Sequence, residues 1–152
     1  MITIALIQPK IPQNTGTIAR TCAANHWDLH LVGDLGFSLD DKYLKRAGLD
    51  YWDYVSYQLF PSETEYLEIL KSKRCHLLTT KSSNIYTEST FKKGDVLIFG
   101  SETDGVSSDF HHGFSDCSYT IPMAEDGIRS LNLAVSVGIV GFEALRQIRG
   151  PH

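Results

Sequence analysis

Short apolar runs alternate along the chain with longer segments in which apolar residues recur at helical spacing. The short runs are rich in Ile, Leu and Val and predict strands near residues 2–7, 28–33, 75–79, 95–99 and 118–121. The longer segments predict helices near residues 14–25, 40–47, 62–72 and 130–148. Strands that alternate with helices indicate an α/β fold, with a mainly parallel sheet covered by helices on both faces.

Polar residues at the predicted helix starts indicate how three of these helices are capped. Ser62 followed by Glu65 predicts a capping box. Asn14 and Ser130 are the expected N-caps of the first and last helices, because their side chains can accept an N–H bond from the first turn. Arg129 would then stand beside a helix N-terminus, which disfavours a cation, so we expect an anionic partner for it.

Length and composition limit the classes of protein that this chain can be. With 152 residues, 42% of them hydrophobic, it fits one compact domain, expected over residues 1–152. The apolar runs break well before the roughly 20 residues that span a bilayer, so we expect a cytoplasmic protein without membrane contact. Cys22, Cys75 and Cys117 are widely spaced and form no C-x-x-C pair. We therefore expect free, buried thiols and no metal site.

The charge of the chain bears on whether it binds RNA. The formal net charge is −4, which argues mildly against RNA because counterion release favours a basic protein. Lys42, Lys45 and Arg46 nevertheless cluster within two helical turns, and further cations lie at 71–74 and 92–93. Each cluster alone is typical of a solvated face. A basic patch assembled from two subunits would reconcile an acidic chain with an RNA partner.

Three polar loops follow predicted strands, at residues 8–17, 100–106 and 122–132. Open α/β sheets hold ligands at the carboxyl ends of their strands, and glycine allows close approach to the backbone. Neither glycine-containing loop has the G-x-G-x-x-G spacing of a dinucleotide site or the spacing of a P-loop. The loops offer apolar side chains and backbone groups, which suit an adenine ring and a thioether or sulfonium. Ordinary strand–loop–helix connections, with Met123 and Leu131 in the core, are the alternative.

Three motifs in these loops carry a family resemblance. They are Asn14-Thr15-Gly16 with Arg20, then Phe99-Gly100-Ser101-Glu102 with Gly105, and then Ile121-Pro122-Met123 with Arg129-Ser130-Leu131-Asn132-Leu133. In this order they resemble the motifs of the SPOUT class of RNA methyltransferases. Asp40-Asp41-Lys42, Arg46–Tyr51 and Leu78-Thr79-Thr80-Lys81 look, more narrowly, like the bacterial tRNA 2′-O-methyltransferases that modify cytidine or uridine at wobble position 34. The resemblance spans the chain.

The resemblance implies a deep C-terminal trefoil knot, S-adenosylmethionine as the cofactor, a homodimer, and the anticodon stem-loop of tRNA as the partner. The cofactor-binding residues that it implies are Leu78, Thr79, Gly100, Ile121, Met123, Ser130 and Leu131. The RNA-binding residues expected are Lys42, Arg46, Lys81 and Arg129. We expect Gly100 to be glycine because the ligand approaches its backbone, so that valine there would block the cofactor and leave the fold cooperative.

The resemblance also implies catalytic roles for Arg20, Asn14 and Glu102. Methyl transfer requires an aligned ribose hydroxyl and the management of one proton. Because a guanidinium stays protonated, Arg20 is expected to orient the target phosphate and stabilise developing oxyanion charge. Asn14 would position Arg20 or the ribose. Glu102 would hold Arg20 or Asn14, or simply cap a turn.

Three positions depart from the family pattern. Ala134-Val135 stands where the family usually has a polar pair, Phe142 lacks a tyrosine hydroxyl, and Asp104 replaces a residue that is often basic. These departures leave two alternatives open, namely the same chemistry on ribosomal RNA, or a catalytically silent RNA-binding module. Apolar and small residues along the last helix, among them Val137, Val140 and Leu145, exceed what one face needs and weakly favour a dimer.

Overall fold

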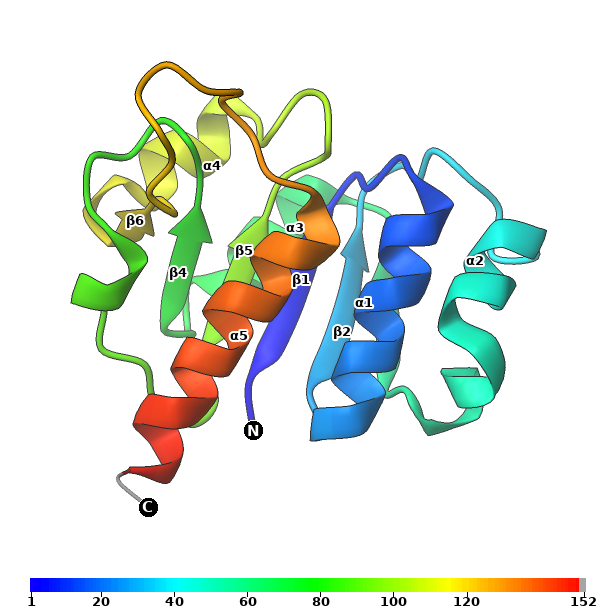
Figure 1. The fold of residues 1–152 in the computed structure, drawn as a ribbon. Helices are drawn as coiled ribbons and strands as arrows, with labels where there is room; N and C mark the ends of the chain where they lie inside the picture. Colours follow the sequence, from blue (N-terminus) through cyan, green and yellow to red (C-terminus); the bar gives the residue numbers. More distant parts are fainter. Residues whose placement is uncertain (151–152) are drawn as a thin grey trace.

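The computed structural model describes residues 1–150, apart from the side chains of residues 48–50, and its centre is a parallel sheet (Figure 1). The strands are β1 (Thr3–Ile7), β2 (Asp28–Val32), β3 (Tyr57–Phe60), β4 (Cys75–Leu78), β5 (Val96–Phe99) and β6 (Ser118–Tyr119). They lie in the order β3-β2-β1-β5-β4-β6, and every pairing is parallel. The α/β fold predicted from the sequence is confirmed.

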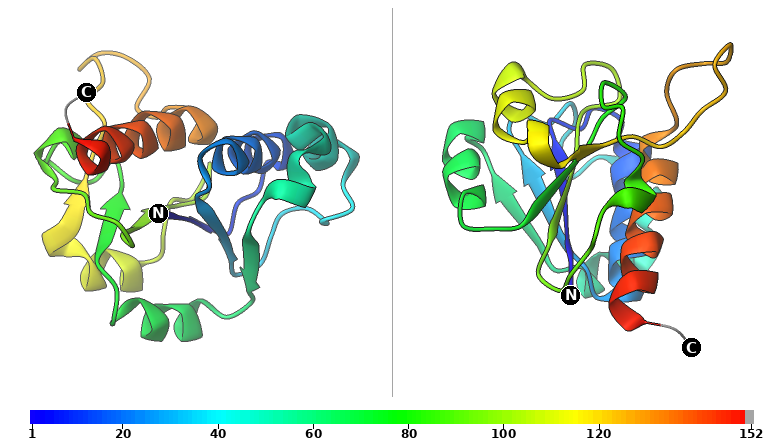
Figure 2. Two further views of the ribbon diagram at one scale, coloured as in Figure 1. Left: turned by 90° about the horizontal axis from the view of Figure 1, so that it is seen from below. Right: turned by 90° about the vertical axis from the view of Figure 1, so that its left-hand side faces the viewer.

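Helices cover both faces of the sheet. The α-helices are α1 (Pro12–Asn25), α2 (Lys42–Gly48), α3 (Glu63–Leu70), α4 (Ser108–Gly113) and α5 (Leu133–Arg149), and the 3-10 helices are η1 (Leu49–Tyr54), η2 (Tyr86–Glu88) and η3 (Ser115–Cys117). Helices α1 and α5 lie side by side on one face, with α2 flanking α1, while α3 and α4 lie on the other face (Figures 1 and 2).

The alternation of side chains along β1 separates the two halves of the core. Ile4 and Leu6 face α1 and α5, while Ala5 and Ile7 face α3 and α4, as expected for a strand buried on both sides. Helix α5 packs closely on this core, because a Cβ at Gly141 would come within 2.6 Å of the Trp27 ring. Glycine at this position therefore fixes how deeply α5 sits.

Strands β1 and β5 are neighbours, but the chain leaves them toward opposite faces of the sheet. After β1 it enters α1, and after β5 it enters α4 on the far face (Figure 1). Such a switch point opens a crevice at the carboxyl ends of the strands, where α/β sheets bind their ligands. The loops after β1 and β5 meet at this point.

Two elements were missed by the sequence pattern. Strand β3 is the exposed edge of the sheet, so Tyr57, Gln58 and Leu59 form no apolar run. Helix α4 has six residues and buries Phe110, which is too short a segment to show a helical period. Elements that bury few side chains leave little trace in a hydrophobic pattern.

Two of the three expected N-caps are wrong. Helix α1 begins at Pro12, so Ile11 is its N-cap and Asn14 lies buried inside the first turn. Helix α5 begins at Leu133, and its N-cap is Asn132, whose side-chain oxygen accepts from the Val135 backbone N–H at 3.2 Å. The cap at Ser62 is confirmed, since its hydroxyl accepts from the Glu65 N–H at 3.2 Å.

The expectations about the cysteines and about α5 are confirmed only in part. Cys22 and Cys75 are buried free thiols, and burial raises the pKa of each to about 12. Cys117 is also free but only partly buried. Val137, Val140 and Leu145, which seemed in excess for one face of α5, are buried in the core of the chain itself. None of the described helices is long and apolar enough to cross a membrane, and residues 1–150 hold no cluster of three or more His, Cys, Asp or Glu side chains suited to a metal ion.

Candidate active site

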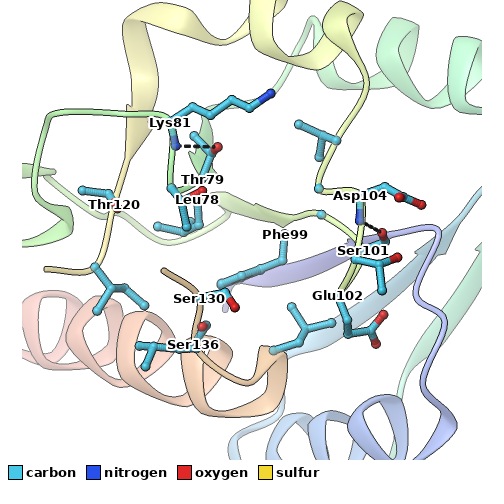
Figure 3. Close-up of a pocket in the computed structure, with 18 of the residues that line it drawn as sticks. Leu78, Thr79, Lys81, Phe99, Ser101, Glu102, Asp104, Thr120, Ser130 and Ser136 are labelled. Carbon is cyan, nitrogen blue, oxygen red and sulfur yellow. Dashed lines mark hydrogen bonds between the residues drawn. The ribbon is translucent and has the colours of Figure 1, made fainter. Parts of the chain in front are cut away.

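A cavity of about 310 Å³ opens at the carboxyl edge of the sheet, between the loops after β4 and β5 and the segment that leads from β6 into α5 (Figure 3). Its lining includes all the residues expected to bind a cofactor, namely Leu78, Thr79, Gly100, Ile121, Met123, Ser130 and Leu131. Phe99 and Leu133 add apolar surface, and Ser101, Thr120 and Ser136 add hydroxyl groups that the sequence reasoning missed. The size suits a small molecule that is mostly surrounded by protein.

Backbone hydrogen bonds fix the walls of this cavity. Thr79 donates its N–H to the Tyr119 carbonyl at 2.9 Å, which joins the β4 loop to β6. Ser101 and Gly105 exchange two backbone hydrogen bonds, at 3.1 and 3.2 Å, and the Asp104 N–H donates to the Ser101 hydroxyl at 2.9 Å. The loop after β5 is therefore a closed turn, and its Gly105 has a positive φ of 66° that suits glycine.

This closed turn corrects the expected reason for glycine at position 100. A Cβ at Gly100 would come within 2.4 Å of the Gly105 carbonyl carbon and 2.7 Å of the Val106 nitrogen. Gly100 is therefore required by the turn itself, whether or not a ligand is bound. A valine there would disturb the loop, so loss of cofactor binding in such a variant would not by itself show that Gly100 contacts the ligand.

Glu102 joins the β5 loop to the start of α1. One of its carboxylate oxygens accepts the Lys10 backbone N–H at 2.8 Å, and the other accepts the Ile11 N–H at 3.2 Å and the Asn14 amide at 3.5 Å. An acidic side chain at a helix N-terminus also interacts favourably with the helix dipole. Two of the roles considered for Glu102 are present in the structure, because it contacts Asn14 and also caps the turn that leads into α1.

Asn132 extends the same chain of contacts to α5. Its side-chain amide donates to the Asn14 side-chain oxygen at 2.9 Å, while its own oxygen caps the helix. Glu102, Asn14 and Asn132 thus link the three loops that carry the family motifs. The sequence reasoning missed Asn132, although asparagine is a preferred N-cap and stood in the third motif.

Arg20 lies outside this network. It is exposed on α1, and its guanidinium carbon is 5.2 Å from the centre of the Tyr51 ring. No hydrogen bond joins it to Glu102 or Asn14, so the expectation that either of them holds Arg20 is wrong. Glu102 and Asn14 instead form hydrogen bonds with each other and with the neighbouring loops.

Asp104, one of the departures from the family pattern, is paired with a cation. Its carboxylate lies 2.5 Å from the Lys10 ammonium. The hydrogen bond and charge of Lys10 hold the pKa of Asp104 below its usual range. The acidic residue is thus compensated by a partner 94 positions earlier in the chain, which sequence spacing could not reveal.

The four cations expected to bind RNA do not form one cluster. Lys42 and Arg46 are exposed on α2, whereas Lys81 lies at the rim of the cavity. Arg129 is exposed in the segment before α5, which projects away from the sheet (Figure 2). Because α5 begins four residues later, Arg129 does not adjoin the helix N-terminus, and among the described side chains it has no acidic partner. The anionic partner expected for it is absent there.

His111 also lines the cavity, opposite the β4 loop that carries Lys81. It is half-buried, while His112 is exposed. Burial, followed by the charges of Lys81 and His112, lowers the pKa of His111. The ring is therefore biased toward its neutral form.

The fold and the cavity define an α/β protein with a site for a small molecule at the carboxyl edge of its sheet, built from three loops that are bonded to one another. The chain belongs to the SpoU rRNA methylase family, whose model matches residues 1–142. The family's fold implies the trefoil knot that the resemblance led us to expect.

One relative and two solved structures show which members of the family this chain is similar to. A protein from Methylovorus glucosotrophus named tRNA (cytidine(34)-2′-O)-methyltransferase is 43% identical over 97% of this chain and 96% of its own length. A solved structure described as giving insights into the 2-OH methylation of C/U34 on tRNA is 43% identical, with a TM-score of 0.93 over 99% of this chain and 98% of that one. An AdoMet-bound rRNA methyltransferase from Sinorhizobium meliloti is 25% identical, with a TM-score of 0.83 over 94% of this chain and 55% of that one.

Proposed function

We propose that this chain transfers a methyl group from S-adenosylmethionine to the ribose 2′-hydroxyl of the wobble nucleotide, cytidine or uridine 34, of tRNA. The observation that carries the proposal is the chain of contacts from Glu102 through Asn14 to Asn132, which ties the loop after β5, a wall of the cavity, to the starts of α1 and α5. Relatives of similar length that are named or described as acting on nucleotide 34 of tRNA support the choice of tRNA over ribosomal RNA.

The cavity suits the proposed cofactor. Leu78, Phe99, Ile121, Leu131 and Leu133 supply apolar surface for an adenine ring, and the hydroxyl groups of the lining are available to fix its orientation. When bound, the cofactor supplies a methyl group activated by the positive charge on sulfur. We assign its binding to Leu78, Thr79, Gly100, Ile121, Met123, Ser130 and Leu131, the lining residues that the sequence also pointed to.

The polar residues divide the remaining work. Both oxygens of Glu102 already accept N–H bonds, so we assign Glu102 to fixing the loops rather than to accepting the ribose proton. Asn14 is buried between Glu102 and Asn132, and it would position the ribose at the edge of the site. Among the described side chains none takes the guanidinium donors of Arg20, which would bind the target phosphate and stabilise charge that develops on the 2′-oxygen.

The assembly that we propose is a homodimer of single methyltransferase domains, acting in the cytoplasm. On the outer face of α5, Val135 is 50% exposed and Phe142 is 49% exposed, with the partly buried Ile139 between them. These residues lie at helical spacing and form an apolar stripe, which a second copy would cover. Lys42, Arg46, Lys81 and Arg129, which are separate on one chain, would then contribute to one RNA face from two subunits.

Mass spectrometry of nucleosides and mapped oligonucleotides tests the proposal. Purified protein is incubated with S-adenosylmethionine and either unmodified tRNA or ribosomal RNA. We expect one methyl group on the ribose of nucleotide 34 in tRNA. Methylation of ribosomal RNA and not of tRNA would show that ribosomal RNA is the substrate. An absence of methylation together with tRNA binding would indicate a silent binding module.

A further inference from the structure

The side chain of Arg20 needs a support that the network of the active site does not give it. Within the described chain, Arg20 forms no ion pair or hydrogen bond, and its guanidinium instead lies over the ring of Tyr51, 5.2 Å from the centroid. A long side chain loses considerable rotamer freedom when it is fixed. An arginine that acts on a reacting centre therefore gains from a contact that restricts it in advance.

We propose that Tyr51 is a positioning residue for Arg20 in methyl transfer. A ring beneath the guanidinium restrains the plane of the group through the attraction of the cation for the aromatic face. It occupies none of the N–H donors, whereas a carboxylate partner would take two of them. The contact thus orients Arg20 and leaves its donors free for the phosphate and the 2′-oxygen. This inference rests on the proposed function.

The placement of Tyr51 supports the inference. Tyr51 belongs to η1, which packs against α1, the helix that carries Arg20. Its neighbour Trp52 is partly buried, packs against the main core and contacts Tyr57 edge-on at 5.5 Å. Val55 is buried in the same core. With these anchors, the Tyr51 ring is presented to α1 by a fixed segment while remaining 39% exposed.

A second cation–ring pair in the same region provides a matched control. The Lys42 ammonium lies 5.0 Å from the centre of the Tyr43 ring, which is 43% exposed. Lys42 and Tyr43 are adjacent in the chain, and the only cation–ring contact that either of them forms among the described residues is the one between them. Removal of the Tyr43 ring therefore deletes an exposed aromatic contact of the same kind without touching the support of Arg20.

The test is single-turnover methylation of a tRNA anticodon stem-loop at saturating protein and cofactor, with wild type, Tyr51→Leu, Tyr51→Phe and Tyr43→Leu. We expect Tyr51→Leu to slow the step about tenfold, because a misplaced reacting group lowers the rate without loss of binding. Tyr51→Phe keeps the ring and should retain the wild-type rate, as should Tyr43→Leu. Affinity for S-adenosylhomocysteine should be the same in all four proteins.

The Arg20→Ala background shows whether Tyr51 acts through Arg20. There, Tyr51→Leu should change the rate less than twofold, because coupled residues are non-additive. A wild-type rate in Tyr51→Leu, or the full tenfold loss on top of Arg20→Ala, would overturn the inference. So would an equal loss in Tyr51→Phe, which would assign the effect to the hydroxyl.

NMR spectroscopy tests the contact between Tyr51 and Arg20 without a measurement of turnover. The Arg20 Nε–H resonance should lose its ring-current shift in Tyr51→Leu and keep it in Tyr51→Phe and Tyr43→Leu. An unmoved resonance would contradict the contact. Failure of wild type to methylate the stem-loop would instead overturn the proposed function, so the two failures are distinguishable.

Discussion

The two sides of the candidate active site are held in different ways. On the proposed cofactor side, hydrogen bonds through Glu102, Asn14 and Asn132 join the loop after β5 to the starts of α1 and α5, and the turn after β5 is closed on itself. On the proposed RNA side, the Arg20 guanidinium lies over the Tyr51 ring, and the other candidate cations are exposed on three separate segments of the chain. The difference indicates a cavity that is formed before binding and an RNA surface whose final arrangement depends on the RNA and a second subunit.

The largest effect is expected at Gly100, in the closed turn after β5, where there is no space for a side chain. Gly100→Ala should weaken S-adenosylhomocysteine binding at least tenfold and lower the Tm by several degrees, because its Cβ would meet the Gly105 backbone at 2.4 Å. Calorimetric titration and thermal unfolding are the measurements. Gly113→Ala is the control, since a Cβ at Gly113 meets no atom within 4 Å. Normal affinity and Tm in Gly100→Ala would show that the turn opens easily.

An intermediate effect is expected at Asn132, where capping and active-site geometry can be separated. Asn132→Ala should lower the free energy of unfolding by about 1 kcal/mol, the usual cost of losing an N-cap. Asn132→Ser keeps a capping oxygen for Val135 but cannot reach Asn14, so it should retain most of the stability while losing methylation rate. Denaturant unfolding and single-turnover kinetics on both variants give the comparison. Equal rates in wild type and Asn132→Ser would leave Asn132 with a capping role alone.

The smallest effect concerns pH, through a buried histidine on β4. His76 is buried between the Ser89 hydroxyl, 2.7 Å from its Nδ1, and the Asp95 carboxylate, 2.8 Å from its Nε2. Burial lowers the pKa of His76 although Asp95 opposes the shift, and burial also lowers the pKa of His30. A lowered folded-state pKa means that the unfolded chain binds protons first as the pH falls. Stability is therefore fully present above about pH 6.5 and declines below it.

The contribution of His76 is measured by comparison with His76→Gln. The free energy of unfolding of wild type should fall between about pH 7.5 and pH 5.5, and the fall should be smaller in His76→Gln by some tenths of a kcal/mol. Denaturant unfolding at the two pH values is the measurement. An equal or larger fall in the variant would mean that protonation of His76 does not oppose folding.

The sequence predicted those parts of the molecule that leave a local trace. Five of the six strands appear as apolar runs, and Ser62 was recognised as a cap because its partner lies three residues away. The residues at the carboxyl ends of β4 and β5 that the family resemblance implied line one cavity. Local signals of this kind define most of the sheet, and the resemblance adds the position of the cavity.

Contacts between distant residues could not be predicted in this way. Asn14 meets Asn132 across 118 positions, and Lys10 meets Asp104 across 94. Whether Glu102 would hold Arg20 or Asn14 depended on the direction of α1, which begins two residues earlier than expected and buries Asn14 in its first turn. The difference between the two sides of the site is a property of such long-range contacts, so it becomes visible only in the fold.

We propose that Arg20 serves the chemistry with RNA and has no part in holding the cofactor. Arg20→Lys tests it most directly, because an ammonium keeps the charge but cannot reproduce the planar fork of the guanidinium. Single-turnover methylation of an anticodon stem-loop at saturating cofactor should slow by roughly two orders of magnitude, as for other lost oxyanion stabilisers, while calorimetry finds unchanged S-adenosylhomocysteine affinity. A wild-type rate in Arg20→Lys, or a loss that follows weaker cofactor binding, would contradict the account.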